Sequence, residues 1–423
     1  MKKILIIIIS LIIPTTYAEE VIYDKEVTNT NDNVIINEEE TNGEELKEEK
    51  EMSLEEEQTN EDDGLNLAKN AKSAIMLEAS TGKIIYEKNA DEQLSMASMT
   101  KMMTLLLIME NIENGNLKWD EMITASENAA SMGGSQIFLE IGEQMTVEDL
   151  VKGICIGSGN DAAVAMAERI GGTEENFVKM MNDKAKELGL KNTNFQNACG
   201  LDTKGHYSSA RDMALIAKEL VKHKKILEYT GTYEDYLRKN TDNSFWLVNT
   251  NRLVRYYQGV DGLKTGYTSE AGYCITTTAK RNNMRLITVV MGEPTSQVRN
   301  AETTTMLDYG FNTYQIDKIL SKDTIISKEN VLLGEKNTVE ITPKEDITIL
   351  NTKIGTKRNI TYKLELDDIK APLKIGDKVG KINVIEDNKT IMTIDAIANN
   401  NIKKLNIFKS YYKELLSILK GNL

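Results

Sequence analysis

The sequence predicts an α+β domain, in which an antiparallel sheet is combined with helices, followed by a small all-β domain and a C-terminal amphipathic helix. Helical patterns dominate the first part of the chain after residue 100, and short strand patterns follow from Val260. Residues 316–398 are rich in Thr, Ile and Val and have no long helical period, whereas the last 22 residues regain one. These changes place the predicted domains at 66–315 and 316–398, with the final helix at 399–423.

The first domain opens with a predicted hairpin, because two short apolar runs, Ala74–Ala79 and Lys83–Glu87, flank a turn that contains glycine. Residues Lys101–Met109 are apolar nearly all round, so this helix should be buried on all sides. The remaining segments are helices at Val147–Cys155, Ala162–Arg169, Glu175–Leu188 and Ala210–His223, and strands at Val260–Gly266, Tyr273–Ala279 and Arg285–Met291.

The N-terminus has the pattern of a secretory signal peptide, predicted at residues 1–18. Two lysines precede an apolar run, Ile4–Ile9, that resumes at Leu11–Ile13, and small residues suited to cleavage stand before Glu19. The apolar core is too short to span a bilayer of roughly 30 Å as a stable helix. An uncleaved anchor is the alternative, and either one predicts export.

The acidic residues of the chain are concentrated in one segment. Residues 19–63 hold 19 Asp or Glu and 3 Lys, a net charge of −16, whereas the whole chain carries −14. The rest therefore sums to +2, so charge gives no argument for a nucleic-acid partner. With Tyr23 as its one aromatic residue, the segment 19–65 is predicted to be a disordered linker. Binding of a basic partner or of Ca²⁺ is the alternative, although the spacing of a calcium loop is missing.

Cysteine and histidine are scarce. Cys155, Cys199 and Cys274 are an odd set for an exported chain, and we interpret them as small buried side chains rather than as a disulfide framework. Only His206 and His223 occur, which argues against a histidine-ligated metal site. We therefore expect no metal and no other cofactor.

The C-terminal segment 399–423 combines an apolar stripe with flanking lysines. The stripe is Leu405, Phe408, Tyr412, Leu415 and Leu419, and the lysines are Lys404, Lys409, Lys413 and Lys420. This pattern predicts a helix that lies in a membrane interface with its lysines near anionic headgroups. A helix docked on the β domain and a coiled-coil seam are the alternatives.

A serine followed three residues later by a lysine places a hydroxyl and an amine on one helical face, where a neutral lysine can take the serine proton. The pattern occurs at Ser80, Ser98, Ser410 and Ser417. Only Ser98 begins a buried helix, because Ser80 lies in the hairpin turn and the other two lie in the tail. Ser98 and Lys101 are therefore the candidate nucleophile and base, with a helix N-cap as the alternative role of Ser98.

Two triplets downstream support this choice. Ser158–Asn160 lies 60 residues after Ser98, and Lys264–Gly266 lies a further 106 residues on, in a predicted strand where glycine lets a substrate backbone approach. A rival triplet, Ser126–Asn128, lies only 28 residues after Ser98 and has no glycine. We interpret it as an ordinary start of a surface helix.

Ser-x-x-Lys, a Ser-x-Asn type triplet and Lys-Thr-Gly, in this order, mark penicillin-binding proteins and class A β-lactamases. Residues 70–400 resemble the low-molecular-weight D-alanyl-D-alanine carboxypeptidases. The matching stretches are Ala97–Thr104, Ser158–Ala163, Gly200–Leu201 with His206–Asp212, Asp261–Gly266 and Pro372–Asp377. The resemblance implies a serine β-lactamase/transpeptidase-like fold and an enzyme that removes the terminal D-alanine from peptidoglycan pentapeptide stems. It also implies β-lactam antibiotics as covalent inhibitors.

The resemblance assigns the chemical steps to particular residues. Lys101, its ammonium disfavoured by burial and by nearby Lys264, would act as base while Ser98 attacks the carbonyl between the two terminal D-alanines. The backbone N–H groups of Ser98 and Tyr267 would hold the oxyanion. Ser158 would pass the proton to the departing amine.

The same resemblance implies the substrate contacts. Asn160 would hold the substrate amide, and Thr265 with Arg252 would bind the terminal carboxylate, beside Lys264 and Gly266. The residues that follow Arg252 depart from the glycine-containing stretch of the family, so an exposed surface charge is the alternative for this arginine.

Two residues near the motifs, His206 and Asp212, are not assigned to catalysis. A lone histidine in a loop is more often structural, and Asp212 fits the first turn of a helix.

Two other functions would use the same serine. A β-lactamase commonly has a glutamate on a loop after the Ser-x-Asn triplet, and no Glu-x-x-x-Asn follows Asn160 there. A penicillin sensor should carry transmembrane helices and a cytoplasmic partner, which the sequence lacks. The peptidase prediction places the protein outside the cytoplasm, on the outer face of the cytoplasmic membrane.

Overall fold

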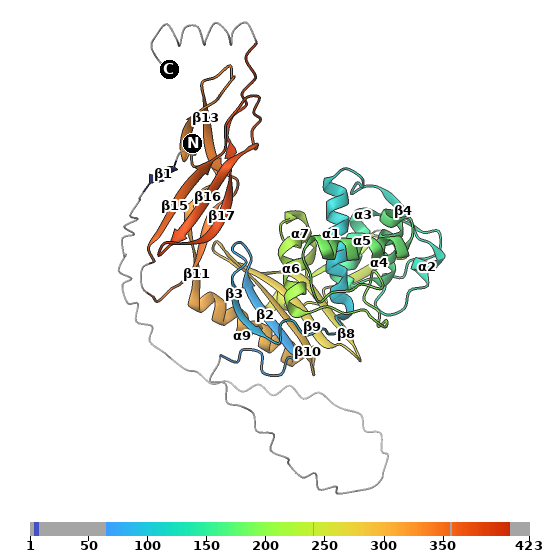
Figure 1. Ribbon diagram of the computed structural model, residues 1–423. Helices are drawn as coiled ribbons and strands as arrows, with labels where there is room; N and C mark the ends of the chain where they lie inside the picture. The colour runs from blue at the N-terminus through green and yellow to red at the C-terminus, as the bar shows by residue number, and fades with distance from the viewer. Residues whose placement is uncertain (1–3, 8–64, 240, 356–357, 407–423) are drawn as a thin grey trace, which may run out of the picture. The chain divides into compact units, whose positions relative to one another are not determined.

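A computed structural model describes residues 4–7, 65–239, 241–355 and 358–406 (Figure 1). Most of the predicted signal peptide, nearly all of the acidic linker and residues 407–423 of the predicted tail helix therefore lie outside the described residues. The linker and the signal peptide stay predictions.

The first domain contains an antiparallel sheet with the strand order β3, β2, β10, β9, β8. The bounds are β2 Ser73–Glu78, β3 Ile84–Lys88, β8 Val260–Thr268, β9 Gly272–Arg281 and β10 Met284–Glu293. Each strand overlaps one of the predicted strands, and β2 with β3 forms the predicted hairpin. Because β8 forms an edge of the sheet, its outer side is available for other contacts.

The helices of this domain are α1 Lys101–Glu113, α2 Glu127–Ala130, α3 Val147–Lys152, α4 Asn160–Gly171, α5 Glu174–Glu187, α6 Ala210–Leu220, α7 Lys224–Thr230, α8 Leu253–Tyr256 and α9 Ser296–Thr313. A tight 3₁₀ turn, η1 Ala97–Thr100, precedes α1, and a wider π-helical turn, η2 Gly153–Gly157, precedes α4. Two small two-stranded sheets pair β4 Met122–Thr124 with β5 Gln144–Thr146 and β6 Glu234–Leu237 with β7 Phe245–Val248. The four helices predicted beyond α1 are confirmed within a few residues, whereas α7, α8 and α9 were not predicted.

Both faces of the sheet are covered. On β2, Ile75 and Leu77 belong to the core cluster that contains α1, α4 and α6, whereas Ala74 and Met76 belong to the cluster that contains α9. Figure 1 shows α9 on one side of the sheet and α1, α4 and α6 on the opposite side. Burial on two faces explains why β2 and β10 are apolar at consecutive positions instead of alternating. The predicted all-round burial of Lys101–Met109 is confirmed, because every residue of this stretch is buried.

The second domain is all-β, as predicted. Its strands are β11 Tyr314–Leu320, β12 Ser327–Asn330, β13 Thr338–Pro343, β14 Ile347–Thr352, β15 Ile360–Leu366, β16 Lys378–Glu386 and β17 Lys389–Ala398. They form a sheet with the order β1, β15, β16, β17, β13, β12 and a separate β11–β14 pair. The edge strand β1, Ile4–Ile7, lies in the predicted signal segment and pairs antiparallel with β15.

The predicted C-terminal helix does not begin at residue 399. Ile402 forms a β-bridge with Leu373, and Lys404 forms one with Gly334, so this part of the chain is extended. The reason is packing: the side chain of Ile402 is buried in the core of the β domain, which fixes its backbone there. Any helix must start later, in residues outside the described range. Within the described residues, no helix has the length and apolarity needed to cross a membrane.

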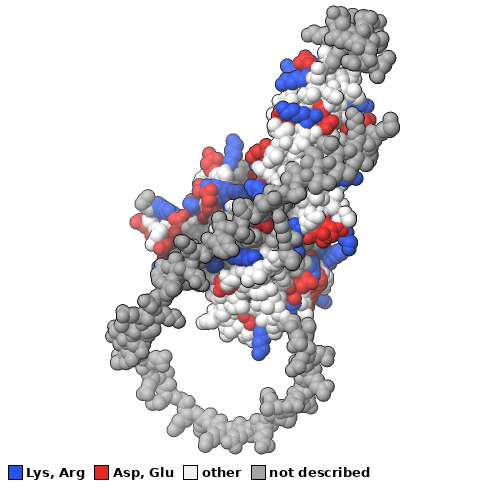
Figure 2. Space-filling model, turned by 90° about the vertical axis from the view of Figure 1, so that its left-hand side faces the viewer, with Lys and Arg blue, Asp and Glu red and all other residues white. Residues whose placement is uncertain are grey.

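Basic and acidic side chains are intermixed on the face drawn in Figure 2. This distribution agrees with the near-neutral charge of the chain outside the acidic segment. It gives no single-sign patch on that face for a polyanion to bind.

Candidate active site

Ser98 lies in the tight turn η1, immediately before α1, and its side chain contacts Lys101 rather than a helix end. Lys101 Nζ is 3.0 Å from Ser98 Oγ. The residue in the N-cap position of α1 is Thr100, and neither η1 nor α1 has a side-chain cap. The capping alternative for Ser98 is therefore not what the structure shows.

Lys101 is fully buried and surrounded by oxygen atoms. Its Nζ lies 2.6 Å from Asn160 Oδ1 and 2.7 Å from the carbonyl oxygen of Cys199, in addition to Ser98 Oγ. Burial lowers the pKa of Lys101 to about 8. A neutral amine has two N–H donors and one lone pair, so donation to Asn160 and Cys199 leaves the lone pair for the hydroxyl of Ser98. This arrangement is that of a base poised to accept the serine proton.

Ser158 and Asn160 are placed by an irregular turn. The π-helical turn η2 ends at Ser158, which has a φ of 63°, and α4 begins two residues later. A positive φ is uncommon for serine and marks a position that the surrounding fold must stabilise. Asn160 Nδ2 donates to the carbonyl oxygen of Gly133 at 2.7 Å. The asparagine thus positions Lys101, a contact that was not predicted, and its second amide N–H is left for a substrate.

Lys264 lies on β8 and is also fully buried. Its Nζ donates to the carbonyl oxygen of Thr265 at 3.0 Å. Burial, and then repulsion from the charge of Lys101, hold the pKa of Lys264 well below its ordinary value. The prediction that Lys101 loses its charge through burial agrees with this geometry, but the repulsion between the two lysines lowers the pKa of Lys264 instead.

Two glycines let other backbone segments approach Ser98. A Cβ added to Gly266 would lie 3.2 Å from the backbone nitrogen of Ser98, so β8 runs directly beside the nucleophile. Gly200, with a φ of +90°, is closer still: an added Cβ would lie 2.0 Å from the carbonyl oxygen of Ala97. Neither position has room for a side chain, which explains the glycines.

The segment that precedes α8 lies alongside β8 and is hydrogen-bonded to it. Asn251 Nδ2 donates to the carbonyl oxygen of Gly262 at 3.0 Å, and Thr265 Oγ1 donates to Thr250 Oγ1 at 2.7 Å. Arg252 is exposed, and its Nη1 donates to the hydroxyl of Tyr233 at 2.7 Å rather than to a residue of β8.

Comparison with known proteins agrees with this geometry. The sequence pattern of the family described as D-alanyl-D-alanine carboxypeptidase matches residues 55–295, and that described as penicillin-binding protein 5, C-terminal domain, matches residues 314–404. The D-alanyl-D-alanine carboxypeptidase DacF of Bacillus subtilis is 52% identical over 339 residues, which cover 80% of this chain and 87% of that protein. The chain belongs to the D-alanyl-D-alanine carboxypeptidase family.

Solved structures lead to the same family. Penicillin binding protein 5 from Haemophilus influenzae has a TM-score of 0.65 at 34% identity, over 79% of this chain and 98% of that one. Penicillin-binding protein D2 from Listeria monocytogenes, in its ampicillin-bound form, has a TM-score of 0.52 at 34% identity, over 57% of this chain and 98% of that one. The chain is thus a serine-type D-alanyl-D-alanine carboxypeptidase, a hydrolase, and the β-lactamase and sensor alternatives gain no support.

One buried cation near the active site of this carboxypeptidase was not predicted. Arg299 belongs to α9 and is only 5% exposed, and its charge contributes to the low pKa of Lys264. Its Nη1 is 3.5 Å from the carbonyl oxygen of Cys274, which pairs with Gly266 on β8. Because α9 has little contrast between an apolar and a polar face, its sequence gave no signal for the helix or for this arginine.

His206 has a structural role, as predicted. It is buried, and burial lowers its pKa to about 4, so the ring is neutral. The backbone N–H of Gln196 donates to Nδ1 at 2.9 Å, which leaves Nε2–H to donate to Thr100 Oγ1 at 2.7 Å. Thr100 in turn donates to the carbonyl oxygen of Ala97 at 2.8 Å. The histidine therefore supports the turn that carries Ser98.

Three further predictions can be compared with the structure. Asp212 lies in the first turn of α6, as expected. Ser126 caps α2, which agrees with its interpretation as an ordinary helix start. The three cysteines are buried and unpaired, which agrees with their interpretation as small buried side chains.

Proposed function

We propose that this enzyme removes the terminal D-alanine from peptidoglycan pentapeptide stems through an acyl-enzyme on Ser98, and that β-lactams acylate the same serine. The observation that carries the proposal is the buried Lys101 amine, whose low pKa and two oxygen acceptors leave its lone pair for Ser98 Oγ. The ampicillin-bound form of the Listeria relative supports the proposal that this enzyme also binds β-lactams.

Acylation begins when Lys101 takes the proton of Ser98 and Oγ forms a bond to the carbonyl carbon between the two D-alanines. The backbone N–H groups of Ser98 and Tyr267 hold the oxyanion, because Gly266 allows β8 to lie directly beside Ser98. Ser158 passes the proton to the leaving amine, and the C–N bond breaks. Water then hydrolyses the ester, which releases the shortened stem and restores Ser98.

Substrate contacts come from the neighbours of these groups. The free N–H of the Asn160 amide holds the substrate amide, while Lys264, Thr265 and Gly266 line the strand along which the peptide lies. Thr265 and Arg252 bind the terminal carboxylate, and for this Arg252 must turn from the hydroxyl of Tyr233, to which its Nη1 donates in this structure. A guanidinium on an exposed side chain can make that change at little cost.

We also propose that residues 1–18 direct export, that residues 19–65 form a linker, and that the end of the chain after Leu405 forms a helix in the membrane interface. An extracytoplasmic location agrees with the family, whose substrate is part of the cell wall. Residues 1–18 are then a signal peptide, and the domains 66–315 and 316–398 stand outside the cytoplasmic membrane.

The membrane proposal predicts that the mature chain floats with anionic liposomes. A chain that ends at Asn406 should lose most of this binding, because most of the apolar stripe and its lysines are removed while Ile402 stays in the core of the β domain. Flotation in a density gradient measures the difference. Equal flotation of the two chains would reject an interfacial helix.

The proposed reaction predicts that the mature enzyme releases free D-alanine from an acetylated pentapeptide that ends in D-Ala-D-Ala. A D-amino-acid oxidase assay measures the product, and the peptide ending in a single D-alanine is the control that should not react. Stable labelling by penicillin with no release from either peptide would favour a sensor instead.

A further inference from the structure

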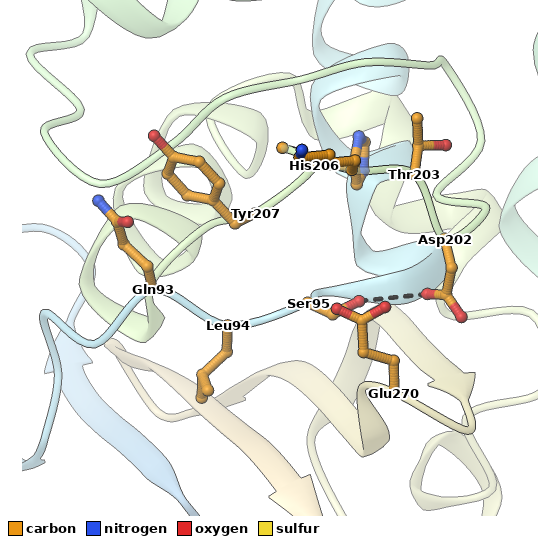
Figure 3. A pocket seen from close by; sticks show the side chains of 10 residues that line it. Gln93, Leu94, Ser95, Asp202, Thr203, His206, Tyr207 and Glu270 are labelled. Atoms are coloured by element: carbon orange, nitrogen blue, oxygen red, sulfur yellow. Dashed lines mark hydrogen bonds between the residues drawn. The ribbon is translucent and has the colours of Figure 1, made fainter.

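A pocket of about 530 Å³ adjoins the active site and has no role in the reaction described so far. Its walls come from three segments: Gln93–Ser95, which precedes the nucleophile, Asp202–Tyr207, which follows Gly200, and Glu270, which follows β8. In Figure 3, Ser95, Asp202 and Glu270 lie together at one side of the pocket, and Gln93 and Tyr207 lie at the other.

Hydrogen bonds connect this pocket to the strand beside the nucleophile. Asp202 Oδ1 accepts from Thr268 Oγ1 at 2.9 Å and from Ser95 Oγ at 3.3 Å. Thr268 is the last residue of β8, directly after Tyr267, whereas Ser95 stands three residues before Ser98. The pocket therefore lies next to the proposed oxyanion site, at the end of β8.

The proposed reaction fixes which part of the substrate reaches the pocket. The scissile carbonyl lies between the N–H groups of Ser98 and Tyr267, and the leaving D-alanine lies toward Thr265. An extended peptide beside the edge strand β8 advances about 3.3 Å per residue. The residue that precedes D-Ala-D-Ala must then lie beside the end of β8, next to Asp202.

The charged side chains of the pocket indicate which kind of substrate side chain fits before D-Ala-D-Ala. Asp202 and Glu270 supply two carboxylates, against one cation in the pocket wall, Lys204. Both acidic residues are exposed, so a ligand can reach them. The hydroxyls of Ser95 and Thr268 hold Asp202 in place, which reduces the entropy lost on binding a cation.

We infer that this pocket is a subsite for the residue before D-Ala-D-Ala, and that it selects a side chain that carries an ammonium group. The inference rests on the proposed function, because the direction of the peptide follows from the carboxypeptidase reaction. Two stem residues offer such an ammonium, lysine and a diamino diacid such as meso-diaminopimelate. The ammonium pairs with Glu270 and Asp202 while the scissile bond lies at Ser98.

The test compares acetylated peptides X-D-Ala-D-Ala in which X is L-lysine, Nε-acetyl-L-lysine or meso-diaminopimelate, with kcat/KM for D-alanine release as the readout. We expect the lysine peptide to exceed its acetylated form by about fivefold, as for a partly exposed ion pair. Glu270→Gln should reduce that ratio to about twofold, and Asp202→Asn provides a second variant. The faster of the two amine-bearing peptides identifies the ammonium that the subsite takes.

Benzylpenicillin acylation provides the control for folding, because this ligand has no amine-bearing side chain that corresponds to residue X. It should acylate wild type and Glu270→Gln at equal rates. Glu175→Gln, at an exposed position of α5 away from the pocket, is the matched charge control and should leave the ratio unchanged. Equal kcat/KM for charged and acetylated lysine, or an equal loss for both peptides in Glu270→Gln, would overturn the subsite. Failure to release D-alanine from any peptide would refute the proposed function instead.

Discussion

Replacement of Lys101 by Met should lower the rate at which benzylpenicillin acylates Ser98 by about 10³-fold, within the range found for removal of a general base. Methionine has a similar length and tolerates burial, but it has no lone pair that accepts the proton of Ser98. Stopped-flow or quenched labelling with a fluorescent penicillin measures the rate. Lys222→Met, at an exposed position, is the matched control and should acylate at the wild-type rate.

The pH dependence of acylation gives a second measurement of the same base. Only the neutral amine of Lys101 can act as the base, and its pKa is about 8. The acylation rate should therefore fall about tenfold for each pH unit well below 8 and level off above it. The residual rate of Lys101→Met should lack this dependence. A wild-type rate that stays constant from about pH 6 to about pH 9, a range on both sides of this pKa, would contradict a lysine base. A Lys101→Met variant that acylates at about a tenth of the wild-type rate would contradict it as well.

Gly200→Ala should destabilise the enzyme and abolish most acylation. Its Cβ would lie 2.0 Å from the carbonyl oxygen of Ala97 and 2.9 Å from the nitrogen of Ser98, so the turn that carries the nucleophile must move. A displacement of about 1 Å at a catalytic group can cost about 10²-fold in rate. Acylation kinetics and thermal unfolding measure the two effects.

Gly142→Ala separates this steric effect from backbone strain. Gly142 has a φ of +82°, close to the +90° of Gly200, but an added Cβ meets no atom within 4 Å. The strain alone should cost about 1 kcal/mol and leave acylation unchanged. If Gly200→Ala behaves like Gly142→Ala, then the contact with Ser98 does not constrain the active site.

Much of the fold could be predicted because local pattern and tertiary burial agree. The all-round apolar helix α1 and the consecutive apolar residues of β2 and β10 have patterns that burial on two faces requires. By contrast, Met306, Leu307 and Phe311 are the large apolar side chains among the buried residues of α9, which also include Arg299 and Thr303, so its sequence has little helical contrast.

The end of the β domain shows the limit of periodicity as a signal. Lys404 and Leu405 fit the helical spacing of the tail, yet the backbone at Ile402 and Lys404 pairs with other segments of the β domain. Burial of Ile402 outweighs the local helical preference at this point. A pattern that begins at a domain boundary does not show on which side of the boundary its first residues pack.

The candidate site could be predicted as motifs, but of its contacts only the one between Ser98 and Lys101 was predicted. Asn160 lies 59 residues after Lys101 in the sequence, yet its side chain hydrogen-bonds to Lys101, which in turn contacts Ser98. The carbonyl of Cys199, which accepts from Lys101, gave no signal, because a backbone oxygen carries no sequence identity. The same holds for Gly200, whose tight contact with Ala97 is a property of the folded chain.

Whether Ser98 forms the covalent intermediate is decided by D-alanine release and penicillin labelling of wild type and Ser98→Ala, measured side by side. The wild-type enzyme should release D-alanine and bind one penicilloyl group, which peptide mapping should locate on Ser98. Ser98→Ala should do neither, although its thermal unfolding should remain close to that of wild type. Release of D-alanine by Ser98→Ala, or a penicilloyl group on another residue, would contradict a covalent intermediate on Ser98.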